Sequence, residues 1–403
     1  MQGFGWKRAL VGVALAATCG ALAATAQARV DTVASAAASP YKVGVIYSRT
    51  GILANYGAEY IEGLRLGLSY ATHGTNKVDG HPIQLTLQDD AGNPATAVSE
   101  AKTLIGQGYK ILMGSVSSAV ALQLAPLAEQ NHVLFISGPA ATDAITGANR
   151  YTFRSGRQSY QDVLAANSFL TGVGRKIVVF AQDYAFGQGN VAAVKAILGG
   201  KGHTVSSILV PLTANDFTPF AQQVVQAKPD LLFVAWAGDT AGAMWQALQQ
   251  QGVFRATTVT TGLAERATWQ SYGPASPSIK FLSHYVWDGP GPKNKVNNWL
   301  VATMKRRGQI PDLFTPDGFN AALMLVHALS KARSDDPDTM ISALEGWKFI
   351  GPKGAMYIRP QDHALIQPMF QVRLVKNAKG VYTDKVLKVI PPSTEQPPLT
   401  PFK

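Results

Sequence analysis

Three loops in the first half of the sequence carry small hydroxyl residues directly after predicted strands. They are Tyr47 to Gly51, Gly114 to Ser118, which includes Ser117, and Ser137 to Thr142. The carboxyl ends of parallel strands meet at one sheet edge, so these hydroxyls and the amides of the following helix N-termini gather there. Such groups suit a carboxylate or a similar anion. Taken singly, each hydroxyl is most simply an N-cap, but their convergence favours an anion site.

The second half of the sequence places different residues at the ends of its predicted strands. Tyr184 and Phe186 follow one strand, Trp236 and Asp239 follow another, and a third leads to Thr261-Gly262-Leu263-Ala264-Glu265. This is an aromatic wall with few charges, although several of these side chains are equally explained as core residues. We therefore expect this half to cover an apolar part of a ligand.

Signatures of catalysis and of metal binding are largely absent from the sequence. The seven histidines are scattered, and no two have the spacing of metal ligands. A serine hydrolase that uses Ser117 or Ser118 lacks a credible base, because His132, the nearest histidine in sequence, precedes the next strand. Residues Gly187 to Ala192 fit a dinucleotide fingerprint, but six residues separate them from the preceding strand. We expect no enzyme activity, cofactor or metal.

The N-terminal segment, residues 1–28, has the pattern of a cleavable signal peptide. Lys7 and Arg8 precede an uncharged run rich in Ala and Leu, and Ala26-Gln27-Ala28 has the small-x-small form that signal peptidase cleaves. Cys19, the single cysteine, lies within this segment. Lipidation of Cys19 is the alternative, although Ala16-Ala17-Thr18 matches that processing signal poorly. The sequence therefore predicts an exported, periplasmic protein whose mature chain has no disulfide.

The charge of the chain is mildly basic and dispersed. There are 36 basic and 25 acidic residues, and two of the basic ones lie in the predicted signal peptide, which leaves a formal charge of +9. Nothing resembles a basic groove interleaved with aromatic residues, so we expect no nucleic-acid partner. The remaining 375 residues are too many for one simple core and suggest two domains.

The elements that must position these loops follow an alternating strand and helix pattern. Apolar runs that read as buried strands each lead into a segment with helical periodicity, and the pattern restarts after Phe153-Arg154. In the first half the strands are expected at 42–46, 83–88, 111–113 and 133–136, and in the second half at 176–180, 204–210, 231–235, 257–261 and 279–282. The fold class is therefore α/β with two doubly wound parallel sheets.

After His284 the sequence is mostly helical and then ends in two strands, 369–375 and 385–390. The tail 391–403 is rich in proline and is expected to be either an extended strap or disordered.

The order of these motifs resembles the periplasmic solute-binding proteins of the branched-chain amino-acid (type I) class, which serve ATP-driven importers. The marks include Lys42-Val43-Gly44-Val45, Asp89-Asp90, the loops already described, Phe153-Arg154 and Gly351-Pro352-Lys353-Gly354. The resemblance implies two lobes joined by a three-segment hinge. Its expected boundaries are 41–156 plus 286–352 for lobe 1 and 157–285 plus 353–390 for lobe 2.

The resemblance also implies where a ligand binds. Ser118, the amide of Ala140, and Thr142 match the family's carboxylate clasp, and Tyr56 matches an aromatic residue at the cleft mouth. Phe186 and the Ala235 to Asp239 loop match ligand-facing positions. Amino-acid binders of the family place a carboxylate against the ligand's ammonium where this chain has Leu263. Unless Glu265 takes that role, the ammonium lacks its partner, and an amine-free acid or an amide becomes a candidate ligand.

The resemblance finally implies the partners. We expect a small carboxylate-bearing ligand, either an amino acid or an organic acid, and the membrane permease of an importer, with the protein itself a monomer. A ligand sensor on the same fold, for amides or amino acids, is the alternative, because a fold alone does not fix function.

Overall fold

The computed structural model describes residues 38–288, 293–394 and 396–402. The predicted signal peptide, with Cys19, lies outside the described residues. From Ala38 onward the chain forms one compact unit. Within the described part, no helix has both the length and the apolar composition needed to cross a bilayer.

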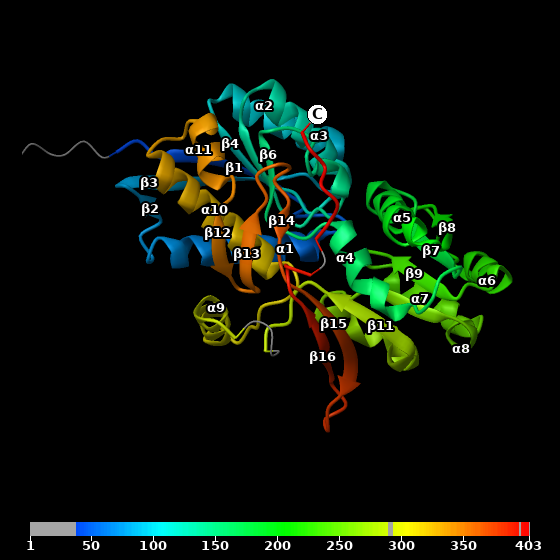
Figure 1. Ribbon diagram of the computed structural model, residues 1–403. Coiled ribbons are helices and arrows are strands. Elements are labelled where there is room, and N and C mark those ends of the chain that lie inside the picture. Colours follow the sequence, from blue (N-terminus) through cyan, green and yellow to red (C-terminus); the bar gives the residue numbers. More distant parts are fainter. Residues whose placement is uncertain (1–37, 289–292, 395, 403) are drawn as a thin grey trace, which may run out of the picture. The chain divides into compact units, whose positions relative to one another are not determined.

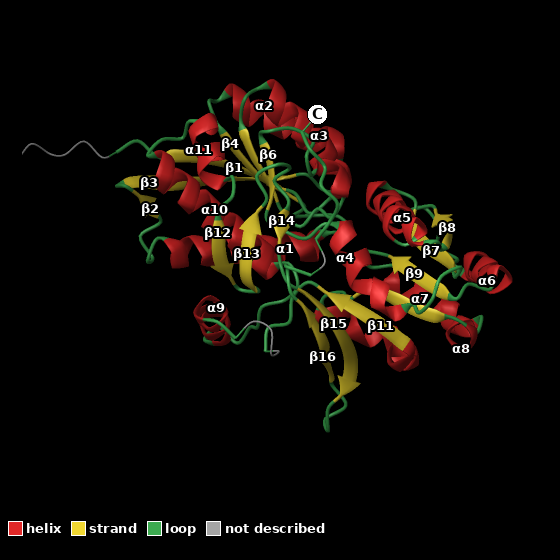
Figure 2. Cartoon of the chain, in the orientation of Figure 1, coloured by secondary structure: helices red, strands yellow, loops and turns green. Residues whose placement is uncertain are grey.

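Lobe 1 is built on a six-stranded sheet with the strand order β2-β3-β1-β4-β5-β6 (Figures 1 and 2). Its strands are β1 (Tyr41–Tyr47), β2 (Lys77–Val78), β3 (His81–Asp89), β4 (Ile111–Gly114), β5 (Leu134–Ser137) and β6 (Thr152–Arg154). All neighbours pair in parallel except β2 and β3. The central strands β4 and β5 consist wholly of buried residues, as expected for a parallel sheet with helices on both faces.

The helices of lobe 1 come from two distant parts of the chain. They are α1 (Ala54–Ala71), α2 (Pro94–Gly106), α3 (Ser118–Gln130), α9 (Lys295–Lys305), α10 (Thr315–Ala332) and α11 (Pro337–Leu344). Helices α1 and α10 approach closely at Gly63, which has no side chain. A Cβ atom at this position would lie only 1.9 Å from the Thr315 carbonyl oxygen. Leu64 and Leu325 then share one core cluster, so α10 completes the lobe that the N-terminal strands begin.

Lobe 2 is built on a seven-stranded sheet with the order β16-β15-β11-β10-β9-β7-β8. Its strands are β7 (Lys176–Gln182), β8 (Thr204–Val210), β9 (Leu231–Ala235), β10 (Thr258–Gly262), β11 (Ile279–Ser283), β15 (Met369–Lys376) and β16 (Tyr382–Ile390). The first five are parallel, and β15 and β16 are antiparallel to their neighbours.

Helices of this lobe are α4 (Ser159–Ala166), α5 (Ala185–Ile197), α6 (Thr218–Ala227), α7 (Ala241–Gln250) and α8 (Val253–Ala256). Short 3-10 segments are η1 (Asp143–Ile145), η2 (Asn167–Phe169), η3 (Gly199–Lys201) and η4 (Arg266–Ser278). The prediction of an α/β fold with two lobes of mainly parallel sheet is confirmed.

A third, small sheet consists of β12 (Lys348–Gly351), β13 (Gly354–Ile358) and β14 (Leu365–Ile366). Met356, Ile358 and Leu365 belong to the same core cluster as the β1 residue Val45, so this sheet packs on lobe 1. The lobe boundary expected between residues 352 and 353 falls in the turn between two of its strands. Since the chain from residue 38 is one compact unit, the division into domains remains a prediction.

Chain segments that pass between the two sheets lie at three places. One runs from the end of β6 to α4, and the second begins at His284 after β11. The third leads from β14 to β15 through Gln367 and Pro368. Helix α4 shares its core cluster with the lobe 2 strands, which places the first passage at residues 155–158.

The proline-rich tail is an extended strap on lobe 1, one of the two predicted alternatives. It leaves β16 at Ile390, which packs with lobe 2, and Figure 1 shows it in red running toward α3. Arg359 donates hydrogen bonds to the carbonyl oxygens of Pro397 (2.9 Å) and Pro398 (3.0 Å). The ring of Phe402 lies 4.6 Å from that of His363. The tail therefore returns to the lobe in which the chain began.

Candidate ligand-binding site

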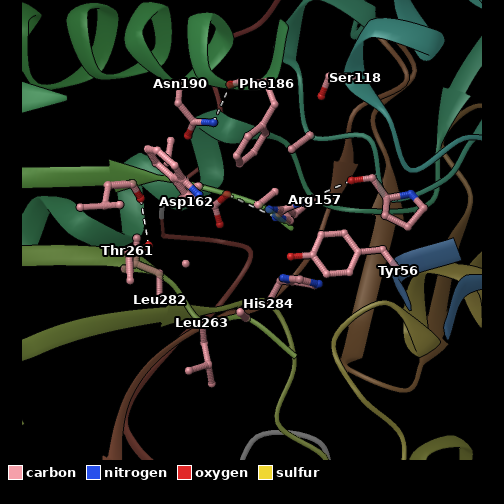
Figure 3. A pocket seen from close by; sticks show the side chains of 18 of the residues that line it. Tyr56, Ser118, Arg157, Asp162, Phe186, Asn190, Thr261, Leu263, Leu282 and His284 are labelled. Atoms are coloured by element: carbon pink, nitrogen blue, oxygen red, sulfur yellow. Dashed lines mark hydrogen bonds and ion pairs between the residues drawn. The ribbon is translucent and has the colours of Figure 1, made fainter. Parts of the chain in front are cut away.

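A pocket lies beyond the carboxyl ends of the strands of both large sheets, where parallel α/β sheets place their ligands. It encloses about 810 Å³ of space, including the part open to solvent. Its lining comes from the start of α1, the loops after β4 and β5, the residues after β6, helices α4 and α5, the ends of β9, β10 and β11, and Phe314. Figure 3 shows the side chains of most of the residues that line this space.

Six of the predicted site residues line this pocket. They are Tyr56, Ser118, Tyr184, Phe186, Trp236 and Leu263. Tyr56 lies near the start of α1, and its ring centroid is 4.4 Å from that of Phe314. The ring of Trp236 stacks on Phe180 at 5.6 Å, and its indole nitrogen donates to the Thr240 hydroxyl at 3.0 Å.

Several of the hydroxyl and amide groups predicted to clasp a carboxylate already have hydrogen-bond partners within the protein. The Thr142 amide donates to Ser118 Oγ at 3.2 Å, and the Ala140 amide donates to the Ser115 carbonyl at 3.2 Å. Ser117 caps α3 by accepting from the Val120 amide at 3.5 Å. Ser117, Ala140 and Thr142 do not line the pocket, whereas Ser118 and Ala141 do. The cap interpretation therefore describes Ser117.

The glycine-rich start of α5 serves close packing. A Cβ atom on Gly187 would lie 1.9 Å from the Gln182 carbonyl oxygen, so the helix starts in contact with the end of β7. Gly189 faces the Thr142 hydroxyl, 3.5 Å from the position of its missing Cβ. The glycines thus bring α5 against its own strand and against the loop after β5, which places Phe186 in the pocket.

The predicted lobe 2 residues Asp239, Leu263 and Glu265 have three different surroundings. Asp239 is exposed and does not line the pocket; it follows Gly238, whose φ of +86° turns the chain there, and its contact with a ligand remains a prediction. The Leu263 side chain packs in the lobe 2 core cluster and is 5% exposed. Glu265 is buried in a smaller adjoining pocket, shared with Tyr56 and Trp236.

Glu265 does not face the main pocket as a free carboxylate. Burial raises its pKa, and hydrogen bonds from its own backbone amide and from the Tyr56 hydroxyl act in the opposite direction. Its Oε2 atom has no hydrogen-bond partner among the described residues. The acid nearest to the Leu263 position thus lies in the adjoining pocket, beside Tyr56.

Sequence reasoning missed three ionisable residues that line the pocket, Arg157, Asp162 and His284. Arg157 Nε lies 3.2 Å from Asp162 Oδ2, and Arg157 Nη1 donates to the Pro139 carbonyl at 3.2 Å (Figure 3). Burial lowers the pKa of His284 well below its usual value, and the positive charges of Arg157 and Lys353 lower it further. His284 is therefore neutral near pH 7.

Two further buried charges stand next to this group. Asp317 Oδ2 is 3.9 Å from His284 Nε2, and neither of its oxygens has a hydrogen-bond partner in the described chain. Burial raises the pKa of Asp317 to about 7, although Lys353 and the two nearby arginines oppose the shift. Burial lowers the pKa of Lys353 to about 7, while Asp317 acts to raise it. Asp317 lies in α10, Lys353 lies in the turn between β12 and β13, and both are far in sequence from Arg157, so no local motif reveals this group.

Comparison with known proteins agrees with this architecture. Residues 40–380 match the family model described as periplasmic binding protein. The chain belongs to this family. A Leu/Ile/Val-binding protein homolog of Brucella abortus is 24% identical over 382 residues, which cover 91% of this chain and 96% of the relative.

Two solved structures from Rhodopseudomonas palustris resemble this periplasmic binding protein along most of its length. An ABC-type branched-chain amino acid transporter of strain CGA009 is 34% identical with a TM-score of 0.75, and the match covers 90% of this chain and all of that one. A solute-binding protein of strain BisB5, in complex with 3,4-dihydroxybenzoic acid, is 26% identical with a TM-score of 0.76 over 89% and 99% of the two chains.

The predicted family is thereby confirmed. The family and its structural neighbours are solute-binding proteins of ABC transporters rather than enzymes, which confirms the expectation of no catalytic activity. Such proteins bind small molecules and work with membrane components.

Proposed function

We propose that this chain is the extracytoplasmic solute-binding component of an ATP-driven importer. Residues 1–28 act as the signal peptide that exports it, and it works in the periplasm as a monomer. It binds one small carboxylate-bearing ligand in the pocket between the two sheets. Ligand binding favours a closed arrangement of the lobes, which the permease recognises.

The ligand is an organic acid without an amine. The observation that carries this proposal is the Leu263 side chain, which packs in the lobe 2 core at the position where amino-acid binders of this class have a carboxylate. Glu265, the nearest acid in sequence, does not line this pocket but lies in the smaller adjoining one, beside Tyr56. An ammonium group placed in the pocket would lose its hydration without gaining a dedicated partner, and burying an unpaired charge costs several kcal/mol even after the surroundings relax.

The walls of the pocket favour an aromatic or bulky aliphatic acid. Phe186, Trp236 and Phe314 contribute aromatic surface, and Leu53 and Val116 contribute aliphatic surface. The BisB5 relative that is 26% identical was solved with an aromatic acid, 3,4-dihydroxybenzoic acid. The CGA009 relative is an ABC-type branched-chain amino acid transporter, so the test must also include amino acids.

A thermal-shift screen of residues 29–403 tests the proposal. The panel contains leucine, valine and phenylalanine, their deaminated acids, benzoate, 3,4-dihydroxybenzoate and the corresponding amides. A ligand that binds only the native state raises Tm, by an amount equivalent to roughly 2.7 kcal/mol at a concentration one hundred times Kd. We expect stabilisation by amine-free acids. Stabilisation by leucine or phenylalanine alone would contradict the amine-free proposal, and no stabilisation by any acid would contradict carboxylate binding.

A further inference from the structure

The positive charge of the pocket comes from the passage between β6 and α4. Of the pocket-lining residues in the described chain, Arg157 is the one with a permanent positive charge. Its side chain is 11% exposed, so a group that pairs with it does so largely out of water. Arg157 is preceded by Gly156, where a Cβ atom would lie 2.8 Å from Asp317 Oδ2, so the segment is packed tightly against α10.

We propose that Arg157 binds the anionic group of the ligand, in place of the hydroxyl and amide groups of the loops after β4 and β5. The ligand class is then a monoanionic, amine-free carboxylate with an apolar body. This inference rests on the proposed function and assigns the residue that determines its specificity.

The guanidinium of Arg157 is held in position but retains donors for a ligand. Nη1 donates to the Pro139 carbonyl, and Asp162 lies on the Nε side at 3.2 Å. The Nε atom has no aligned hydrogen bond within the described residues, so the pair is an ion pair without full hydrogen bonding. A guanidinium carries five N–H donors in a planar fork, which matches a carboxylate in two parallel bonds. Because Asp162 occupies the Nε side and no described residue accepts a hydrogen bond from Nη2, a ligand carboxylate can pair with the Nη1–Nη2 edge of the guanidinium.

Asp162 forms an ion pair with Arg157 and is therefore a poor partner for a ligand ammonium. Burial raises the pKa of Asp162, and the neighbouring positive charges of Arg157 and Lys353 oppose that shift. An ammonium that approached Asp162 would therefore meet these two cations at short range, and like charges in a buried site repel strongly. An anion is attracted by Arg157 but repelled by Asp162, so it must pair with the part of the guanidinium that faces away from Asp162.

The loop groups have less to offer an anion. The Thr142 amide is bonded to Ser118 Oγ, and the Ala140 amide is bonded to Ser115. The Ser118 hydroxyl lines the pocket and can still donate its proton, so it supplies one neutral hydrogen bond. A charged bond from Arg157 is worth more than a neutral one.

The test is calorimetric titration of benzoate, 3,4-dihydroxybenzoate and 4-methylpentanoate into the wild type, two variants of Arg157 and one control variant. Arg157→Gln keeps a donor for Asp162 but loses the charge, and we expect it to weaken each acid that binds the wild type by at least ~10-fold. Arg157→Lys keeps the charge and loses the fork, so its loss should be smaller. Arg150→Gln removes the same charge from an exposed ion pair with Asp338 and should leave affinity unchanged.

A further variant, Asp162→Asn, and a separate measurement of folding distinguish a loss of binding from a loss of stability. Asp162→Asn removes the carboxylate that competes for the guanidinium, so we expect acids to bind as tightly as in the wild type or more tightly. Circular dichroism melts of each variant report folding independently. If acids bind the wild type and folded Arg157→Gln equally well, or if Asp162→Asn abolishes acid binding, the assignment of Arg157 is overturned while the proposed function stands. If no acid binds the wild type, both are overturned.

Discussion

The two polar sides of the pocket differ in how their groups are satisfied. On the loop side, Ser117, Ala140 and Thr142 bond to neighbouring backbone or hydroxyl groups. On the hinge side, where chain segments pass between the two sheets, Nε of Arg157 and Nε2 of His284 have no hydrogen-bond partner among the described residues. A polar group already paired within the protein stabilises the fold, whereas a buried unpaired one is costly unless something binds it.

This difference shows that residue type at a strand end does not identify a ligand contact. Hydroxyls after β4 and β5 belong to a local network in which Ser48 and Ser115 also donate to the buried Asp90, each at 2.6 Å. The hinge charges lie where segments from separate parts of the chain meet. The loops therefore shape the pocket, and the hinge supplies its charge.

Replacing the whole hinge ion pair gives the largest expected effect. In Arg157→Met combined with Asp162→Leu, no charge is left buried alone, and exchange of a buried ion pair for apolar residues is often neutral or stabilising. We expect Tm to be unchanged or higher, while carboxylate affinity measured by calorimetry falls by ~10-fold or more. Retained affinity in this folded double variant would show that the charge of the hinge is not used.

A pair of glycine substitutions compares the packing of the two sides. Gly156→Ala would bring a Cβ within 2.8 Å of Asp317 Oδ2, so we expect a loss of about 1–3 kcal/mol in the free energy of unfolding. Gly189→Ala, which faces Thr142 at an ordinary 3.5 Å, is the matched control and should be neutral or stabilising because alanine favours the helix. Urea denaturation measures the free energy of unfolding of both variants. Equal losses would show that Gly156 and Gly189 are packed equally tightly.

The pH dependence of stability sharpens the description of the hinge side. The pKa of Asp317 is raised to about 7 in the folded protein, so the native state binds this proton more tightly than the unfolded state. Stability from this group is full below the ordinary aspartate pKa and is lost as the pH rises to about 7. We expect the Tm of Asp317→Asn relative to wild type to increase from pH 4.5 to pH 7.5. A constant difference would mean that Asp317 titrates normally.

The smallest effect is expected on the loop side. Ser118→Ala removes the acceptor of the Thr142 amide, so folding should lose about 0.5–1.5 kcal/mol. Carboxylate affinity should fall less than ~5-fold, because a single neutral hydrogen bond is lost. A loss of affinity as large as that of Arg157→Gln would indicate that the loops after β4 and β5 bind the carboxylate. Val120→Ala, on the same helix but within its core cluster, is the control for a change in stability alone.

Local patterns predicted the fold well because each strand and helix carries its own periodicity. The runs expected at 176–180 and 231–235 lie in β7 and β9, and the two terminal strands are β15 and β16. The expectation for Tyr56, Phe186 and Trp236 as pocket residues also agrees with the lining, since each sits next to the end of its element.

The charged part of the site was not predictable in this way. Arg157 and His284 are 127 positions apart in sequence, and each alone reads as an ordinary polar residue near a strand end. Burial of Lys353, Asp162 and Asp317 together depends on the passages between the sheets meeting. Asp239 differs from its neighbour Trp236, which lines the pocket, because the turn at Gly238 leaves Asp239 exposed; whether Asp239 contacts a ligand remains a prediction.

The path of the tail sets an order on the assembly of the molecule. A chain made from its N-terminus provides β1 to β6 first, but α10 and the small sheet on β12 come after most of lobe 2. The bonds from Arg359 to Pro397 and Pro398 form only when the last residues are present. Lobe 1, which begins first, is thus completed only after lobe 2, so a chain synthesised only as far as β11 lacks α10 and the small sheet that complete lobe 1.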